Sequence, residues 1–454
     1  MISPEELASH LRVHGVSSAS EASRALGISQ PTFSRLAARL GPRIARIGKA
    51  RATRYGLVRE VRGLGTRWPV YRVDGRGRTR EVGTLHALHP ASWWFEARGE
   101  ASAWLHEEFA DGLFPGLPWF LVDLRPQGFM GRAFAYRYGD TLGLKRDPSL
   151  WSADDILVAM LAYGEDLQGD LIVGERALER ARELRRSVEV IARDARVARY
   201  AELAERALEG EAVGSSAGGE QPKFTAYVDD GADSVRAVIV KFSGPIETPA
   251  GRRWADLLVA EHLAGEVLRA HGLPASESEV VVAGRRYCLE MTRFDRVGAH
   301  GRRGFASLAA LGAEYHGHYN DWRDAADLLT RDGWITPEDD ARLRLLWWFG
   351  EWIANTDRHL GNVGVFVGDA RPLALAPAYD TLPMLYRPAS TGEVVEREFD
   401  PLDAPPNEIA AWTRAAEMAL VFWRRVAADA RVSPEFRAIA AGNAVRTEGR
   451  TRSA

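Results

Sequence analysis

The sequence has 454 residues, of which 46% are hydrophobic and 27% are charged, a composition that excludes a disordered chain and allows about three domains. No stretch approaches the roughly 18 apolar residues of a membrane span, and the start MISPEELASHL lacks a signal-peptide pattern, so we expect no membrane partner. The single cysteine, Cys288, excludes an intrachain disulfide and a cysteine-based metal site. We therefore predict a protein of a reducing compartment, the cytoplasm.

The net charge of −3 hides an uneven distribution of charge along the chain. Residues 1–80 hold 16 of the 59 Lys and Arg residues but only 5 of the 62 Asp and Glu residues. A basic end on an acidic body indicates a polyanionic partner for that end alone. A solvated basic face is the simpler interpretation of the charge by itself, so the choice depends on the pattern within these residues.

The first forty residues predict three short helices. Ser3-Pro4-Glu5-Glu6 is typical of a helix start with a capping box, and further helices fit residues 20–26 and 30–40. The turn Gly27-Ile28-Ser29 separates the last two helices, as in a helix-turn-helix whose second helix enters the major groove. The residues spaced to bury one side of these two helices are Ala22, Leu26, Ile28, Phe33 and Leu36. Those that would face outward and read base edges are Gln30, Thr32, Ser34 and Arg35.

Residues 43–58 alternate apolar and basic side chains around Gly48, which predicts a β-hairpin wing. The basic residues placed for phosphate contacts are Arg43, Arg46, Lys49, Arg51 and Arg54. No acidic residue lies between Glu21 and Glu60. We therefore predict a winged helix-turn-helix domain over residues 1–60 that binds double-stranded DNA, in preference to a small helical protein-interaction module.

Residues 61–210 predict a subdomain that is rich in β-structure at its start and helical at its end. Period-two alternation over residues 68–85 predicts two strands joined at Asp74-Gly75. Residues 151–210 predict mainly helix, ending in an amphipathic stretch from Leu178 to Leu208. A catalytic core is expected over residues 211–435, followed by a polar tail over residues 436–454.

The core begins with a loop of small residues, Gly214 to Phe224, that is followed by a strand. Such a loop exposes backbone N–H groups and lets a phosphate approach closely, although Glu220 after Gly219 excludes a Walker A loop. A flexible linker is the simpler interpretation of this loop taken alone.

A predicted strand over residues 238–241 ends in Lys241. In protein kinases, a lysine at the end of such a strand contacts nucleotide phosphates and pairs with a helix glutamate, which Glu261 can supply here. A surface lysine at a strand end is the alternative.

The segment Asn355-Thr356-Asp357-Arg358-His359-Leu360-Gly361-Asn362 follows an amphipathic helix and precedes a strand. Asp357 and Asn362 have the spacing of the kinase catalytic loop, in which Asp accepts the proton of the substrate hydroxyl and Asn binds Mg²⁺. A polar turn is the alternative. Asp380, 18 residues after Asn362, is placed to be the second metal ligand. These pieces predict an ATP·Mg²⁺ site in which Lys241 and Asp357 are catalytic.

At these motifs the chain resembles the HipA family of bacterial serine/threonine kinases, the toxins of type II toxin–antitoxin pairs. Within that family it is similar to the YjjJ-like branch, which carries its own N-terminal helix-turn-helix. The resemblance extends from about residue 67 to residue 430 and includes three further motifs, Asp123-Leu124-Arg125-Pro126, Gly164-Glu165-Asp166-Leu167-Gln168-Gly169 and Arg293-Phe294-Asp295-Arg296. It implies an α+β fold, with a bilobal kinase-like body behind the N-terminal winged helix-turn-helix domain.

The resemblance also implies specific site residues. Asp357 would be the proton acceptor, and Asn362 and Asp380 the metal ligands. The modified residue in autophosphorylation would be Ser216, with Ser215 beside it as the alternative. The implied ATP contacts are Gly218, Gly219, Lys223, Lys241, Thr292, Phe294, His359, Asn362, Tyr379 and Asp380.

The implied substrate is a protein, such as the aminoacyl-tRNA synthetases that known family members phosphorylate to arrest growth. The founding HipA type obtains its DNA-binding part from a separate antitoxin, HipB, whereas this chain has a fused head, so a HipB-like antitoxin is one open partner. A homodimer on DNA is another. Two alternative functions remain: a DNA-binding regulator that senses ATP with little kinase activity, and a small-molecule kinase.

Overall fold

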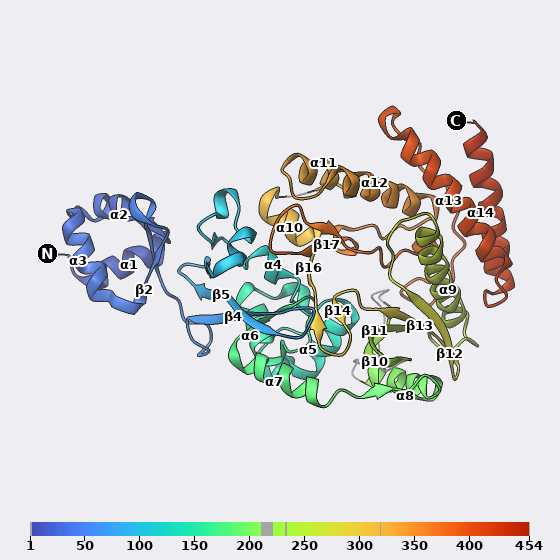
Figure 1. Cartoon of the computed structure of the whole chain (residues 1–454), viewed down its shortest axis with the longest axis horizontal. Coiled ribbons are helices and arrows are strands. Elements are labelled where there is room, and N and C mark those ends of the chain that lie inside the picture. The colour runs from blue at the N-terminus through green and yellow to red at the C-terminus, as the bar shows by residue number, and fades with distance from the viewer. Residues whose placement is uncertain (1, 210–220, 232–233, 318, 454) are drawn as a thin grey trace. The chain divides into compact units, whose positions relative to one another are not determined.

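The computed structural model describes residues 2–209, 221–231, 234–317 and 319–453. Helices and several sheets alternate along the chain, which gives a mixed α+β fold (Figure 1). Contacts divide the chain into two compact units, of which unit 1 comprises Met1–Val73, Arg78–Arg125 and Trp151–Leu184 and unit 2 comprises Asp74–Gly77, Pro126–Leu150 and Arg185–Ala454.

These boundaries differ from the predicted subdomain over residues 61–210. Residues Pro126–Leu150 belong to unit 2 because helix α5 (Gly128–Leu142) contacts strand β10 (Lys223–Gly231) of that unit. Residues 1–60 cluster with the rest of unit 1, where Arg54 forms an ion pair with Asp111. Both differences arise from contacts between segments far apart in the sequence.

Unit 1 begins with the three predicted helices, α1 (Pro4–His14), α2 (Ala19–Leu26) and α3 (Gln30–Leu40). The side chains of Ser3 and Glu6 form the predicted capping box at the start of α1. Gly27 ends α2 with a left-handed backbone, φ +63°, which glycine adopts without steric cost. A three-stranded sheet in the order β1-β3-β2 accompanies these helices, and its strands are β1 (Ser17–Ser18), between α1 and α2, and β2 (Ile44–Ile47) and β3 (Arg54–Leu57), after α3.

The three helices and this small sheet share one hydrophobic core. Leu7 and Leu11 of α1, Ala22 of α2, and Phe33 and Leu36 of α3 are buried in it. Partly buried apolar residues, including Leu26 and Ile28 at the turn, pack against the cluster. The apolar spacing of the sequence therefore places one face of each helix in a common core.

The rest of unit 1 is built on a five-stranded sheet in the order β7-β6-β5-β4-β8. Its strands are β4 (Arg67–Val73), β5 (Thr79–Ala87), β6 (Trp93–Ala97), β7 (Leu113–Phe114) and β8 (Leu171–Val173). The predicted strand pair over residues 68–85 is confirmed as β4 and β5, which are antiparallel. The helices of this part are α4 (Trp119–Val122), α6 (Ala153–Tyr163) and α7 (Glu175–Arg186).

The prediction of mainly helix over residues 151–210 is only partly right. Strand β8 follows α6, and a short strand β9 (Val190–Ile191) separates α7 from α8 (Arg196–Glu209), so the amphipathic stretch from Leu178 to Leu208 is not continuous. The reason is tertiary, because β9 pairs in parallel with β10, with Val190 opposite Tyr227. The helical period of the surrounding residues carries no sign of that pairing.

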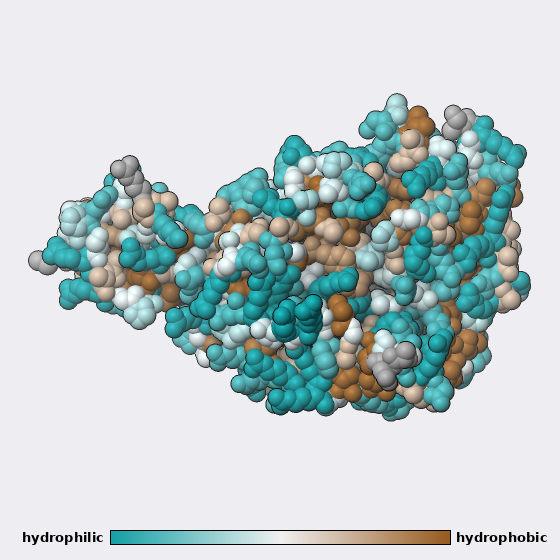
Figure 2. All heavy atoms as spheres, in the orientation of Figure 1, coloured by the Kyte–Doolittle hydropathy of each residue, from teal (hydrophilic) through white to brown (hydrophobic). Residues whose placement is uncertain are grey.

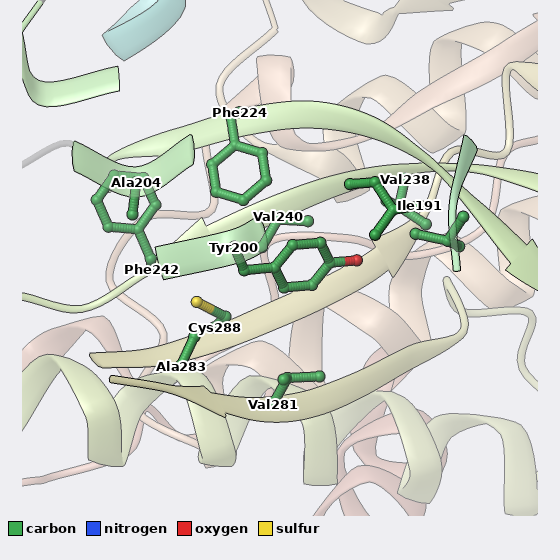
Figure 3. Packing of buried hydrophobic residues seen from close by; sticks show 11 residues of the cluster. Ile191, Tyr200, Ala204, Phe224, Val238, Val240, Phe242, Val281, Ala283 and Cys288 are labelled. Atoms are coloured by element: carbon green, nitrogen blue, oxygen red, sulfur yellow. The ribbon is translucent and has the colours of Figure 1, made fainter. Parts of the chain in front are cut away.

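Unit 2 contains a second five-stranded sheet, in the order β12-β13-β11-β10-β9. The strands not yet given are β11 (Ser234–Phe242), β12 (Ser278–Ala283) and β13 (Arg286–Thr292). Helix α8 packs against β10 and β12, and Figure 3 shows its Tyr200 among Phe224, Val240 and Cys288 of the sheet. Helix α9 (Pro249–Ala270) contacts β11, β12 and β13.

The remainder of unit 2 combines helices with short strands. Its helices are α10 (Leu308–Tyr315), α11 (Trp322–Arg331), α12 (Pro337–Trp352), α13 (Ile409–Ala428) and α14 (Pro434–Ser453). A small sheet in the order β16-β17-β18 is formed by β16 (Gly304–Ser307), β17 (Gly364–Val367) and β18 (Ala374–Leu375). A two-stranded pair is formed by β14 (Arg296–Val297) and β15 (Gly301–Arg302).

The predicted polar tail over residues 436–454 is wrong, because α14 is a 20-residue helix that packs against α13. Phe436, Ala440 and Asn443 are buried on it, and the Asn443 amide nitrogen donates to the Tyr386 hydroxyl at 2.8 Å. Polar and apolar residues are both frequent on this helix, and its buried positions pack it against the rest of unit 2.

Hydrophilic side chains cover most of the face shown in Figure 2, and apolar side chains occur there in small patches. Among the described residues, no helix is long and apolar enough to cross a membrane.

Candidate active site

Lys241 is the buried centre of the candidate site. It lies near the end of strand β11 and is 5% exposed, and its ammonium group donates to Glu261 Oε1 at 2.5 Å. The same group also donates to the carboxylate of Asp380. A buried ammonium is stable only with such partners, so the two acids explain how a cation can occupy this position.

The two acids that contact Lys241 differ in the exposed fraction of their side chains. The Glu261 side chain on α9 is 3% exposed, whereas that of Asp380 is 30% exposed. Burial raises the pKa of Glu261, whereas for Asp380 the opposing effect of burial is outweighed by the Lys241 and Lys223 ammonium groups, which lower its pKa to about 2. Asp380 therefore keeps its negative charge to a lower pH than Glu261 does.

The ammonium of Lys241 is held in its charged form by the same contacts. Burial by itself lowers the pKa of Lys241, but the carboxylates of Asp380 and Glu261 outweigh burial and raise it above its ordinary value. A permanent positive charge in a buried site is suited to an anionic ligand such as a phosphate.

The loop after α12 carries Asp357 and Asn362. The Asn362 amide nitrogen donates to the Asp357 backbone carbonyl at 2.9 Å, which closes the loop on itself. Asp357 is half-buried, Asn362 is buried, and the exposed His359 accepts from the Gly361 backbone N–H through Nδ1 at 3.0 Å. His359 thus has a structural hydrogen bond within the loop.

Arg358 anchors this loop to α12. Its guanidinium donates to the Glu351 carboxylate and to the Asn355 backbone carbonyl, and it lies 4.8 Å from the ring centre of Trp347. A second contact is made by Trp322, whose indole N–H donates to the His359 carbonyl at 3.0 Å. The loop is therefore held from both α12 and α11.

Hydrogen bonds join the Asp357 loop to the segment that carries Tyr379 and Asp380. The Tyr379 hydroxyl donates to the Gly361 carbonyl at 2.8 Å, and the Asn355 amide nitrogen donates to the Asp380 carbonyl at 3.4 Å. Because Asp380 also contacts Lys241, the structure brings the strand lysine, the loop and the second aspartate into one neighbourhood.

The segment after β13 places aromatic residues beside Tyr379. The ring of Phe294 lies 5.5 Å from that of Tyr379 and 5.4 Å from that of Phe305. The hydroxyl of Thr292 accepts a hydrogen bond from Arg236 at 3.0 Å. Lys223, at the start of β10, is directly opposite Lys241 in the antiparallel pairing of β10 and β11.

Three of the residues predicted at the site, Gly218, Gly219 and Ser216, lie outside the described residues, as does Ser215. The other predicted residues of the ATP site all belong to unit 2. Asn355 and Arg358 are not among the predicted site residues, although both stand within the Asp357 motif. The signal for Asn355 is its buried polar side chain, and the signal for Arg358 is its contacts with Glu351 and Asn355, both of which only the structure reveals.

The residues present fit a magnesium ion that arrives with a nucleotide. Asp380 is ionised and its Oδ1 accepts from Lys241, while the Asn362 amide nitrogen is used by the loop, so Asp380 Oδ2 and the Asn362 side-chain oxygen can serve a hard cation. Within the part of the chain that the structure describes, no cluster of three or more His, Cys, Asp or Glu residues could hold a metal. Two protein ligands plus phosphate oxygens are the usual arrangement for Mg²⁺ in phosphoryl transfer.

The predicted DNA-reading residues lie at the start of α3. Gln30, Ser34 and Arg35 are exposed, and Thr32 is half-buried and shares hydrogen bonds with Ser29 and Arg35. Lys49 in the loop between β2 and β3 is exposed, and the side chain of Arg51 lies outside what the structure describes.

Two of the arginines predicted to contact phosphates already have acidic partners. Arg43 donates to both carboxylate oxygens of Glu5, at 2.7 and 3.1 Å, and Arg54 forms an ion pair with Asp111. Both acids lie in unit 1. A phosphate would have to compete with these carboxylates, so the two arginines are weaker candidates than Lys49.

Two family models match the chain. The first is described as YjjJ-like toxin, middle domain, and matches residues 64–182. The second is described as HipA-like C-terminal domain and matches residues 215–441, the segment that contains the whole candidate active site.

Individual proteins resemble the chain as well. It is 40% identical over 435 residues to Toxin YjjJ of Escherichia coli, a match that covers 95% of this chain and 94% of that protein. Among solved structures, HipA in a complex with HipB and operator DNA from Shewanella oneidensis aligns with a TM-score of 0.52 at 14% identity, over 85% of this chain and 97% of that one. The likeness to this solved structure shows a HipA-like fold. The chain therefore belongs to the HipA family of toxins, in its YjjJ-like branch.

Proposed function

We propose that this protein is an ATP-dependent serine/threonine protein kinase of the HipA type, which transfers the γ-phosphate of ATP to a protein hydroxyl group. The observation that supports this most strongly is the position of Lys241 between Glu261 and Asp380, next to the loop of Asp357 and Asn362. A strand lysine paired with a helix glutamate, a loop Asp and Asn, and a second Asp are the parts that kinases use for phosphoryl transfer.

Each of these side chains has a proposed role. Asp357 would accept the proton of the attacking hydroxyl, and Lys241 would neutralise phosphate oxygens. Asn362 and Asp380 would hold Mg²⁺ through their oxygen atoms. When bound, ATP·Mg²⁺ supplies the phosphoryl group and a cation that balances its charge. The remaining predicted contacts to the nucleotide are Gly218, Gly219, Lys223, Thr292, Phe294, His359 and Tyr379.

The proposed substrate is a protein, with an aminoacyl-tRNA synthetase as the first candidate, and its phosphorylation would inhibit growth. The proposed autophosphorylation site is Ser216, or Ser215 beside it. These proposals follow from membership of the HipA toxin family and from the residues of the candidate site. The proposed location is the cytoplasm, where ATP and such substrates are found.

We also propose that residues 1–60 form a winged helix-turn-helix domain that binds double-stranded DNA. Support comes from the turn between α2 and α3, the exposed residues at the start of α3, and the basic composition of this end of the chain. The Shewanella oneidensis HipA structure contains HipB and operator DNA, so a HipB-like antitoxin is a further proposed partner. A homodimer would match a two-fold operator.

The kinase proposal is tested with γ-labelled ATP·Mg²⁺ in a cell lysate, comparing wild type with Asp357→Asn. Asp194→Asn is the matched control because it changes an exposed carboxylate in the loop before α8. We expect labelling of the protein itself and of one other band, both lost in Asp357→Asn and both retained in Asp194→Asn. Absence of label in wild type, with ATP binding intact, would instead indicate a DNA-binding regulator that senses ATP. A phosphorylated metabolite without any labelled protein would indicate a small-molecule kinase.

A further inference from the structure

Asn355 lies between the two segments that carry the acidic residues of the site. Its side-chain oxygen accepts a hydrogen bond from the Asp357 backbone N–H at 3.0 Å, and its amide nitrogen donates to the Asp380 backbone carbonyl at 3.4 Å. The residue is 2% exposed, so water cannot easily replace either partner. One planar amide therefore links the Asp357 loop to the Asp380 segment.

The backbone of Asn355 is itself fixed. Its N–H donates to the Gly350 carbonyl at 2.8 Å, and its own carbonyl accepts from the Arg358 guanidinium. Through these bonds the residue is attached to the end of α12, whose last turns are buried. The position of the amide between its two backbone partners is therefore fixed by hydrogen bonds on its own main chain.

Both linked segments have an unusual backbone conformation nearby. Ala354, directly before Asn355, has φ +57°, and Asp380 has φ +51°, although neither is glycine. Such left-handed residues cost free energy and persist where the surrounding contacts determine them. The hydrogen bond from Asn355 to the Asp380 carbonyl is one of those contacts.

The chemistry of the two bonds requires an amide. Asparagine offers an acceptor and a donor on one short planar group, whereas an ionised aspartate offers only acceptors and leucine offers neither. Losing both bonds would leave the Asp357 N–H and the Asp380 carbonyl without this partner. These are the backbone groups of the proposed proton acceptor and of one proposed metal ligand.

We propose that Asn355 is a positioning residue for phosphoryl transfer, which sets the separation between the Asp357 carboxylate and the Asp380 carboxylate. This inference rests on the proposed kinase function. Asn355 does not contact the reacting atoms in this scheme, and it acts through the backbone of the two acids. Displacing a catalytic group by about 1 Å can reduce a rate by about 100-fold, so a small displacement of either carboxylate would have a large effect on the rate of transfer.

The first test compares Asn355→Leu with Asn443→Leu. Asn443 is the matched control because it is also buried, at 4% exposure, and its amide also donates one hydrogen bond, to the hydroxyl of Tyr386, whose ring packs against Trp423 and Phe436 of helices α13 and α14. We expect Asn355→Leu to lower kcat by about 10- to 100-fold, with little change in KM for ATP at saturating Mg²⁺. Asn443→Leu should lower the melting temperature to a similar extent and leave kcat unchanged. Equal kcat values for the two variants would overturn the proposal.

A binding measurement separates this inference from the kinase function. The dependence of ATP binding on Mg²⁺ concentration is measured by calorimetry for wild type and Asn355→Leu, without any phosphate transfer. If wild type transfers no phosphate, the kinase proposal fails, and a weaker Mg²⁺ dependence in the variant still supports the positioning role. If wild type transfers phosphate and the variant equals it in both kcat and Mg²⁺ dependence, only the positioning role fails.

Discussion

Lys241 and Asp380 are 139 residues apart in the sequence, and in the folded chain the ammonium of one donates a hydrogen bond to the carboxylate of the other. Glu261 contacts the same ammonium from helix α9. The three groups come from a strand, a helix and an irregular segment, so their meeting depends on the correct packing of all three. This small network links the stability of unit 2 to the chemistry proposed for it.

The charge of Asp380 predicts a pH dependence of stability. Burial opposes ionisation, but Lys241 and Lys223 lower the pKa of this carboxyl from its ordinary 3.8 to about 2. A lowered folded-state pKa stabilises the fold above pH 4 or so, and this contribution is lost as the pH falls through about 2. The free energy of unfolding of wild type should therefore fall relative to that of Asp380→Asn, by about 2 kcal/mol between roughly pH 5 and pH 2.

Urea unfolding followed by circular dichroism at a series of pH values measures this difference. A constant gap between wild type and Asp380→Asn across the range would show that the carboxylate is not stabilised by the two lysines.

A second prediction concerns Gly350 in the last turn of α12. A Cβ at this position would lie 2.6 Å from Cδ of Arg358, so Gly350→Ala must displace the side chain that anchors the Asp357 loop to Glu351. We expect phosphate transfer to fall by about 10- to 100-fold, because the loop loses its position. Single-turnover kinetics with γ-labelled ATP would measure the effect.

Gly442→Ala is the matched control for this variant. Gly442 is exposed on α14, and a Cβ there meets no atom within 4 Å. This change should leave transfer unchanged and raise the free energy of unfolding by about 0.5–1 kcal/mol, since alanine favours the helix. Full activity in Gly350→Ala would mean that Arg358 is not needed to hold the loop.

A third prediction concerns the proposed DNA contact of Lys49. This side chain is exposed, whereas the Arg43 guanidinium is occupied by Glu5. Each phosphate contact contributes about 0.9 to the slope of log K against log salt concentration, so Lys49→Ala should reduce the slope by about that amount. Arg43→Ala should change it much less. Fluorescence anisotropy with duplex DNA at several salt concentrations measures both, and the opposite order would refute the assignment.

Local patterns in the sequence are enough to predict many elements of this protein. The capping box at Ser3, the glycine turn after α2 and the alternation over β4 and β5 act between near neighbours, and the structure contains each of them. The Asp357–Asn362 motif is also recognisable from the sequence, because both residues belong to one short segment. These features need no knowledge of distant contacts.

The wrong predictions, a continuous helix over residues 178–208 and a polar tail over residues 436–454, have one physical cause. Strand β9 exists because it pairs with β10, and α14 is a helix rather than a tail because Phe436 and Asn443 are buried in unit 2. Neither the pairing nor the burial is encoded in the residues next to these segments. The composition of residues 436–454 alone therefore does not show which positions of α14 are buried.

The sequence by itself determined the residue types of the site, their order along the chain and the family to which they point. Only the tertiary structure decided that Lys241 is shared by Glu261 and Asp380, that Arg43 and Arg54 already have acidic partners, and that Asn355 joins the Asp357 loop to the Asp380 segment. Hydrogen bonds and ion pairs act over about 3 Å, so sequence separation does not predict them. They form where packing brings distant segments together.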